Sequence, residues 1–382
     1  MLLCIIVSTL ISFSHENFME DFLRRNKVPI RYPFNTYRNG WNMSYFIENE
    51  FLRNNVTKAI KIIKKETCLN FTEVDEKEKL SKDGNAVIFR YANNCTALPG
   101  RDPNNKPSYL FLHKECMSSY KVQILLGFML GRYTEDPICN NNDFLKFLSG
   151  NVSQKDDKSL KDKIQNEITK LANDKKIEFN ITEYIKNLTG LTIFKLLDGK
   201  YYNTIDQDHL SFSDYRLINK YYCQRICRNK LSCKNSGYID SRNCGRCKCP
   251  MFYEGTYCDK LKKSSKSCSK KQHINLTTKK TANIKDSGMK VCFKSIKAPE
   301  GKRIRISLQQ VNYKKKREGP PYRCLPKQSL EIKSSKDKGP MGRLFCTTLR
   351  SYIFDSHSNV VDLRYSGLSK SDGYNMHVKV IG

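Results

Sequence analysis

Histidines and cysteines are the side chains with which this chain could do metal or nucleophilic chemistry, and the histidines are widely spaced. The sequence contains six of them, at His15, His113, His209, His273, His357 and His377. A metal-binding helix needs two His at positions i and i+4, which lie one turn apart on the same face, with a Glu beside the first. Since no two histidines have that spacing, the sequence predicts no helix-borne histidine metal site.

Cysteine chemistry is a second possibility, and it is also poorly supported. A catalytic cysteine needs a histidine next to its thiolate. The candidates are Cys139 and His113, and no oxyanion-hole motif accompanies them. His113 falls in Tyr109–Cys116, a run that we interpret as a strand. We therefore interpret His113, and His209 likewise, as structural residues.

The sixteen cysteines indicate disulfide bonds, because most of them are crowded between Cys223 and Cys346. This usage fits an oxidising compartment. With Cys4 in a leader segment, an odd number remains and one thiol stays unpaired. Residues 227–258 hold six cysteines, too dense for a hydrophobic core, so disulfides must stabilise them. A zinc knuckle at Cys244-x-x-Cys247-x-Cys249 is the alternative, and it needs reduced thiolates.

Two sequence features predict secretion. Residues 1–14 read as a signal peptide, and residues 15–29 as a short pro or linker segment with a dibasic pair, Arg24-Arg25. Glycosylation acceptors of the N-x-S/T type occur at Asn42, Asn55, Asn70, Asn94, Asn151, Asn180, Asn187 and Asn275. No later stretch reaches the ~20 apolar residues of a membrane span, so we expect no membrane anchor.

The formal net charge is +30, which indicates either a polyanionic partner or many cationic side chains on a solvated surface. Secretion argues against nucleic acid as a partner. Lysine is spread along the chain, so we interpret most of it as solvated surface. The clusters in 260–280 and 314–317 remain candidates for contact with sulfated polysaccharide, a matrix polyanion.

The length suits two or three domains. Residues 30–223 contain both strand-like and helical apolar spacing, which predicts one α+β domain. We expect the cysteine-rich residues 224–259 to follow it, then a basic linker at 260–267 and an all-β domain at 268–382. Apolar spacing predicts helices at 55–65, 120–130 and 154–178, and a strand at 86–91. Period-two alternation predicts strands at 303–309, 330–333 and 376–381.

Specific segments of the first domain resemble the astacin family of zinc metallopeptidases. These are residues 30–34 (IRYPF), 65–71 (KETCLNF) and the domain's close at 210–223 (LSFSDYRLINKYYC). The resemblance implies a metzincin-like peptidase domain with Cys139 left over, followed by an EGF-like module and a CUB sandwich. It also implies the pairs Cys68–Cys223, Cys95–Cys116, Cys227–Cys244, Cys233–Cys247, Cys249–Cys258, Cys268–Cys292 and Cys324–Cys346. Pro326 replaces the Asp of calcium-binding CUB domains, so we expect no calcium there.

The residues that bind zinc in this family are replaced here. The pattern H-E-x-x-H-x-x-G-F-x-H aligns through Gly127-Phe128, which puts Tyr120, Ile124 and Leu130 at the ligand positions. Lys121 stands at the general-base position, and Phe194 at the Tyr that follows the Met-turn. Aliphatic side chains offer no lone pairs, and a phenol with a pKa near 10 is a poor sole ligand. We therefore expect no bound zinc and no other cofactor.

The resemblance and the replaced residues together favour a secreted, inactive metallopeptidase homologue that binds an extracellular protein or a matrix polyanion. An active secreted zinc metalloendopeptidase is the alternative, and it needs ligands from elsewhere in the chain. A damaged gene product is a third hypothesis, against which the regular cysteine spacing argues. The sequence leaves open whether Cys139 joins two chains.

Overall fold

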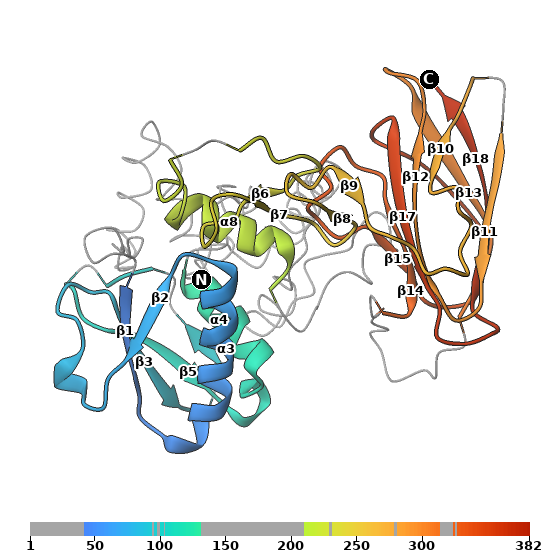
Figure 1. Cartoon of the computed structure of the whole chain (residues 1–382). Helices are drawn as coiled ribbons and strands as arrows, with labels where there is room; N and C mark the ends of the chain where they lie inside the picture. The colour runs from blue at the N-terminus through green and yellow to red at the C-terminus, as the bar shows by residue number, and fades with distance from the viewer. Residues whose placement is uncertain are drawn as a thin grey trace, which may run out of the picture.

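The structure, a computed structural model, describes residues 42–130 and 210–382, apart from residues 94, 98–99, 103, 229–230, 279–280, 314–323 and 325–326. Three parts follow one another along the chain: an α+β part, a cysteine-rich part and a β-sandwich (Figure 1). Several predictions lie outside the described residues: the segments 1–14 and 15–29, the helix at 154–178, the cluster at 314–317, Cys139, Phe194, Pro326, Asn94, Asn151, Asn180 and Asn187.

The first part is built on a five-stranded sheet in the order β2-β1-β3-β5-β4. Its strands are β1 (Asn42–Ile47), β2 (Asn70–Glu73), β3 (Ala86–Tyr91), β4 (Thr96–Ala97) and β5 (Ser108–Leu112). Only β4 runs antiparallel to its neighbour. β1 alternates in burial, so that Met43, Tyr45 and Ile47 face the core. The strand predicted at 86–91 is confirmed as β3.

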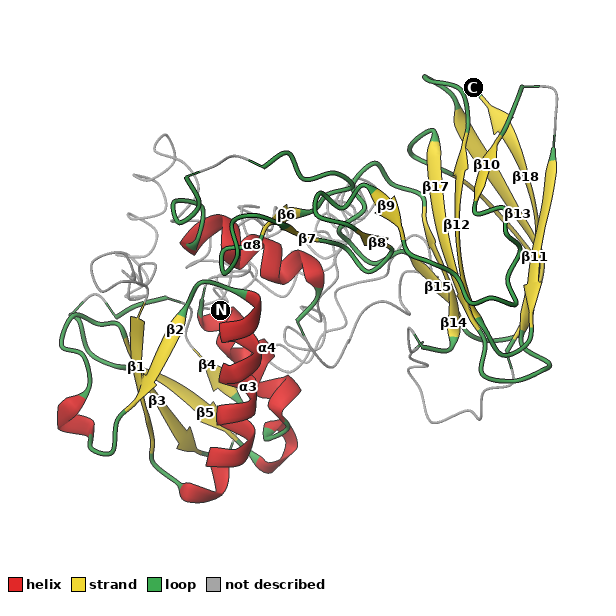
Figure 2. Ribbon diagram, viewed as in Figure 1, coloured by secondary structure: helices red, strands yellow, loops and turns green. Residues whose placement is uncertain are grey.

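Helices α3 (Arg53–Glu66) and α4 (Ser119–Met129) pack against each other beside this sheet (Figure 2). Val56, Ala59, Ile60 and Ile63 form one buried stripe of α3, as the helical period requires. The predicted helices at 55–65 and 120–130 are thereby confirmed. Short 3-10 turns lie at η2 (Glu50–Leu52), η3 (Lys77–Lys79) and η4 (Lys114–Cys116).

The strand predicted at 109–116 is wrong in its second half. β5 ends at Leu112, and η4 follows at Lys114. The amide of Cys116 donates to the carbonyl of His113 at 2.9 Å, and Cys116 is bonded to Cys95. A bridge from this point to Cys95 draws the chain out of the sheet, so it turns instead of continuing.

Helix α8 (Phe212–Tyr222) closes the first part. Ser211 caps it: its hydroxyl accepts from the Asp214 amide at 3.3 Å, and the Asp214 carboxylate accepts from the Ser211 amide at 2.7 Å. The helix ends at Cys223, which is bonded to Cys68 just beyond α3. The two ends of the described domain are therefore tied together covalently.

The cysteine-rich part contains two small hairpins and three disulfides. β6 (Tyr238–Ile239) pairs with β7 (Cys247–Lys248), and β8 (Tyr253–Glu254) pairs with β9 (Lys260–Leu261). Because β9 is part of the second hairpin, the linker predicted at 260–267 begins later than expected. The bridges are Cys227–Cys244, Cys233–Cys247 and Cys249–Cys258. These sulfurs are oxidised, so the zinc-knuckle alternative is wrong.

The last part is a sandwich of two sheets, with strand orders β10-β12-β17-β14-β15 and β11-β18-β13-β16. The strands predicted at 303–309, 330–333 and 376–381 are confirmed as β13, β14 and β18, but β14 is buried on both faces and does not alternate. Disulfides join Cys268 to Cys292 and Cys324 to Cys346. The strands are β10 (His273–Asn275), β11 (Ala282–Ser287), β12 (Val291–Lys297), β13 (Arg303–Asn312), β14 (Ser329–Lys333), β15 (Arg343–Phe345), β16 (Leu349–Asp355), β17 (Val360–Ser366) and β18 (Gly373–Ile381).

The cysteine-rich part packs against the first of these sheets. The ring of Phe252 meets that of Phe293 at a centroid distance of 5.9 Å, and the Tyr253 hydroxyl donates to Asp362 at 2.6 Å. In Figure 1, β8 and β9 accordingly lie beside the sheet of β12 and β17. No helix within the described ranges is long and apolar enough to cross a membrane.

Candidate functional site

Helix α4 carries the positions at which the sequence alignment looks for metal ligands. Tyr120 and Ile124 are one turn apart and share a face, the geometry that two ligands would need. Tyr120 is 51% exposed, Lys121 is exposed and Ile124 is half-buried. The structure therefore brings these positions to the outer face of the helix, with a phenol, an ammonium and an aliphatic group in place of ligands and base.

The opposite face of α4 is packed into the core. Val122, Leu126 and Met129 are fully buried there. Gln123 is buried as well, and its side-chain oxygen accepts from the Tyr215 hydroxyl at 2.8 Å, which ties α4 to α8. These contacts fix the rotation of the helix, so Tyr120 and Ile124 cannot exchange places with the buried face.

Leu130, at the third ligand position, lies in the hydrophobic core and is 2% exposed. Its backbone carbonyl accepts from the Tyr222 hydroxyl at 3.0 Å. A side chain in this environment packs against apolar neighbours and presents no donor atom. The structure therefore does not bring Leu130 together with Tyr120 and Ile124 as a chelating set.

Zinc does not fit the residues at these positions. Zinc in peptidase sites is held by imidazole, thiolate or carboxylate donors, and α4 offers none of these at Tyr120, Ile124 or Leu130. Among the residues that the structure describes, no group of three His, Cys, Asp or Glu side chains could hold a metal ion. The ring of His113, which precedes η4, lies 6.3 Å from that of Tyr91.

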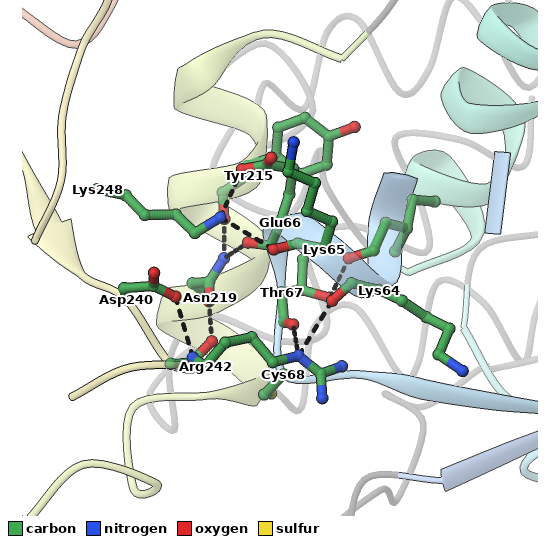
Figure 3. A network of polar contacts seen from close by, with 12 residues as sticks. Lys64, Lys65, Glu66, Thr67, Cys68, Tyr215, Asn219, Asp240, Arg242 and Lys248 are labelled. Atoms are coloured by element: carbon green, nitrogen blue, oxygen red, sulfur yellow. Dashed lines mark hydrogen bonds and ion pairs between the residues drawn. The ribbon is translucent and has the colours of Figure 1, made fainter. Parts of the chain in front are cut away.

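A second polar site joins the first two parts of the molecule at the C-terminus of α3 (Figure 3). The last four carbonyls of a helix have no partner within the helix. In α3, Thr67 caps Ile63 through its amide and its hydroxyl, at 2.9 and 2.8 Å. The other three carbonyls accept hydrogen bonds from residues far away in the sequence. Arg242 donates to the Lys64 carbonyl at 3.0 Å, Lys248 to the Lys65 carbonyl at 3.0 Å, and Asn219 to the Glu66 carbonyl at 2.8 Å.

Arg242 makes the largest number of these contacts. Its guanidinium also donates to the carbonyls of Thr67 and Leu69, both at 2.8 Å, and to the Asn70 side chain at 2.9 Å. Lys248 adds an ion pair with Glu66 at 2.7 Å. The negative end of the helix dipole favours cations at this place. The cysteine-rich part is thus held against α3 by charge-assisted hydrogen bonds.

Arg216 on α8 reaches the β-sandwich. It forms two hydrogen bonds with Asp337, at 3.0 and 2.8 Å, and donates to the Ser236 carbonyl at 3.3 Å. Burial alone would raise the pKa of Asp337, but hydrogen bonds from Arg216 and Ser236 lower that pKa to about 2. Because the pKa is depressed by folding, this ion pair stabilises the fold above about pH 4 and is lost as the pH falls towards 2.

Replacing Arg242 by alanine should lower the free energy of unfolding by about 1–3 kcal/mol, because it leaves several carbonyls without donors. Urea denaturation of the purified chain measures this change. The control is Arg228→Ala, an exposed arginine of the same cysteine-rich part, whose loss should cost less than about 0.5 kcal/mol. Equal effects of the two substitutions would contradict the interpretation of Arg242 as the docking residue.

The fold and the site together define a disulfide-bonded protein with an α+β domain, whose helix α4 carries Tyr120, Lys121 and Ile124 at the aligned ligand and base positions. The comparison with protein families agrees on the domain: residues 34–223 match the model of the astacin peptidase family. Through these residues, the chain belongs to the astacin family.

Similar proteins are zinc metalloproteinases of nematodes. The protein nas-34 of Caenorhabditis elegans is 26% identical over 315 residues, which are 80% of this chain and 49% of that protein. The protein nas-37 of the same organism is 35% identical over 174 residues, covering 44% of this chain and 21% of its own length. This chain therefore spans about half or less of the length of these relatives.

Solved structures show only weak similarity. The CUB1-EGF-CUB2 region of human MASP-1/3 is 16% identical, with a TM-score of 0.24, and covers 43% of this chain and 56% of its own. High choriolytic enzyme 1, a hatching enzyme zinc-protease of medaka, is 19% identical, with a TM-score of 0.22. The match covers 26% of this chain and 48% of that enzyme's chain. Scores this low support no conclusion about this chain.

The other residues singled out by the sequence are distributed as follows. The structure contains the seven disulfide bonds implied by the resemblance. Of the glycosylation acceptors, Asn42 and Asn275 are exposed, while Asn55 and Asn70 are half-buried. Sequence reasoning missed Arg242, Lys248, Arg216 and Asp337. No signal marked them, because a single charged residue has no sequence pattern that distinguishes it from solvated surface.

Proposed function

We propose that this chain is a secreted astacin homologue without peptidase activity, a pseudoenzyme that acts by binding an extracellular protein or a matrix polyanion. The observation that carries the proposal is the chemistry of α4, where Tyr120, Lys121, Ile124 and Leu130 stand at the ligand and base positions. The metal supplies both an activated water and an electrophile in zinc peptidases. A domain that cannot bind the metal keeps its fold and its binding surfaces, but it cannot hydrolyse peptide bonds by this mechanism.

The remaining parts fit a binding role. We propose that residues 224–259 form an EGF-like domain and residues 268–382 a CUB-like domain, in keeping with their disulfide pairs and the two-sheet sandwich. Seven disulfides suit an oxidising, extracellular environment. The glycosylation acceptors and residues 1–14 as a signal peptide belong to the same proposal. We expect no nucleic acid partner.

The test is the zinc content and the activity of the purified secreted chain. We expect well below one zinc per chain by atomic absorption, and no digestion of casein. An active astacin peptidase, assayed in parallel and inhibited by EDTA, is the positive control. Stoichiometric zinc together with EDTA-sensitive casein digestion would overturn the proposal.

The alternative function is an active secreted zinc metalloendopeptidase that cleaves extracellular proteins. It is favoured by membership of the astacin family and by relatives named zinc metalloproteinases. It requires zinc donors other than the side chains at positions 120, 124 and 130. The same assay distinguishes the two functions, because only an active enzyme would be sensitive to a chelator.

A further inference from the structure

The outer face of the sheet β11-β18-β13-β16 collects cationic side chains from all four strands. The sheet register places residues side by side in rows across the strands. The first row is Lys285, Asn375, Gln310 and Arg350, the second is Asn283, His377, Ser307 and Ile353, and the third is Lys379, Arg305 and Asp355. Arg303 lies beside Ile381 one step further on. Asp355 is the carboxylate among these side chains.

This face is directed away from the rest of the described molecule. The opposite sheet takes the contacts with the cysteine-rich part, through Phe293 and Asp362. Figure 1 shows β11, β13 and β18 on the far side of the sandwich from α8. Lys285, Arg303, Arg350 and Lys379 are exposed. The hydrogen bond from Arg305 is the largest cause of the lowered pKa of Asp355, and the charges of Arg303 and Lys379 lie close enough to lower this pKa further.

An open pocket of about 430 Å³ adjoins the first row. It shares Lys285, Gln310 and Asn375 with that row, and is further lined by Asn312, Lys290 and Lys370. The side-chain oxygen of Asn375 is buried and has no hydrogen-bond partner. A buried acceptor without a donor costs free energy unless a ligand or water satisfies it. The pocket therefore offers amide groups to a ligand that carries hydroxyl or N–H donors.

The two carboxylates in the pocket wall are already engaged. Asp286 pairs with Lys294 and accepts from the Tyr374 hydroxyl at 2.8 Å. Asp372 accepts from the amides of Leu368 and Ser369, at 2.8 and 3.0 Å. Asp286 also pairs with Lys290 at 3.6 Å. Both carboxylates are thus engaged within the protein, so an incoming ligand meets chiefly Lys285, Lys370 and the amides.

We propose that this face and its pocket, which we call the basic sheet face, bind an anionic polysaccharide. The proposal rests on the proposed function, since it specifies which matrix polyanion chemistry is recognised. Sulfate or carboxylate groups pair with the cations, and sugar hydroxyl or N–H groups reach the amides of Gln310 and Asn375. A flat sheet suits an extended chain, because neighbouring strands present side chains every ~4.8 Å and successive outward residues every ~7 Å. The site therefore centres on the sheet, and it meets the lysine cluster at 260–280 only at the pocket rim, where Lys290 donates to the Ser267 carbonyl at 3.3 Å.

The first test compares charge removal on two surfaces of the full secreted chain. The triple variant K285Q/R303Q/K379Q should bind a heparin decasaccharide at least tenfold more weakly at 0.15 M NaCl, and its salt slope should fall by roughly 2–3, near one unit per cation lost. The matched control K58Q/K61Q/K65Q removes the same charge from exposed lysines on helix α3, in the first part of the molecule, and should retain its affinity within about threefold. Equal losses in both variants would overturn the proposal.

Two further variants act in opposite directions. Asp355→Asn removes the carboxylate from the face and should strengthen heparin binding, while Asn375→Ala should weaken it severalfold without altering the salt slope. Folding is checked by thermal denaturation of each variant. Unchanged affinity in both would contradict the proposed site.

The nature of the polyanion is decided by separate arms with heparin, chondroitin sulfate and hyaluronan. Phosphatidylserine vesicles form a fourth arm, because Met289 and Leu368, 67% and 53% exposed, lie on the loops that carry Lys290 and Lys370. Binding of vesicles but of no polysaccharide would overturn the proposal. If the polysaccharide proposal fails, the proposed lack of peptidase activity still stands, because zinc content and casein digestion are measured independently.

Discussion

Replacing Asp362 by alanine should lower the free energy of unfolding by about 3–5 kcal/mol, the usual effect of removing one partner of a buried ion pair. Asp362 is fully buried on β17, and one of its oxygens accepts from both the Lys338 ammonium at 2.9 Å and the Tyr253 hydroxyl at 2.6 Å. Without the carboxylate, a buried ammonium loses its counter-charge and a buried hydroxyl loses its acceptor.

Lys338 has little compensation available. It is 4% exposed, and its other acceptors are the carbonyls of Val360 at 2.8 Å and Lys333 at 3.3 Å. Burial lowers the pKa of Lys338, and the Asp362 charge opposes that shift. Removing Asp362 therefore takes away the main influence that opposes burial and favours the neutral amine, which costs stability at neutral pH.

Urea denaturation of Asp362→Ala measures this effect, and Asp355→Asn is its control. Asp355 pairs with Arg305 at 2.7 Å on the exposed sheet, where the two side chains are 31% and 42% exposed. An exposed pair should contribute less than about 1 kcal/mol. Because Tyr253 belongs to the cysteine-rich part, Asp362→Ala should also make that part more sensitive to limited proteolysis. A loss below that of Asp355→Asn would contradict the buried network as the anchor between the two parts.

Removing the Cys68–Cys223 disulfide by a double alanine substitution should cost about 5 kcal/mol, because the bridge closes a very long loop in the unfolded chain. The two cysteines are separated by 155 residues in the sequence and are each 4% exposed. Cross-linking such distant residues removes much of the conformational entropy of the unfolded state. Substituting both residues avoids a reactive thiol.

The control is the double substitution of Cys95 and Cys116, which are separated by 21 residues. The same entropy relation predicts a loss of about 3 kcal/mol for this shorter loop. Urea denaturation midpoints of the two variants, at equal slope, rank the bridges directly. A larger loss for Cys95 and Cys116 would show that local packing, rather than loop closure, governs their contribution.

Much of the local structure could be predicted from the sequence because it follows from the spacing of apolar residues. Val56, Ala59, Ile60 and Ile63 fall on one helical face, and that face is the one buried in α3. The strand at 86–91 is a short apolar run with the bounds of β3. The boundary error at Cys116 arose because a disulfide, which no periodicity encodes, redirects the chain after Leu112.

The candidate sites were predictable to different degrees. The ligand positions on α4 were identified by alignment, and Leu130 then proved to be a core residue because the end of α4 packs against Tyr222. The basic sheet face was not predicted, since its cations lie on four strands between Lys285 and Lys379 and form no run in the sequence. The dense lysines at 260–280 were the more visible feature, although they are not the ones that gather on a sheet.

The sequence by itself determined the residue chemistry: which donors are missing from α4, which cysteines exist to pair, and which segments alternate. These are properties of side-chain types and of spacing, and they need no knowledge of neighbours. Only the tertiary structure decided that Arg242 completes the C-terminus of α3 and that Asp362 is buried with Lys338. Such contacts join residues far apart along the chain, and their energies depend on burial and distance, which the packing of the whole molecule sets.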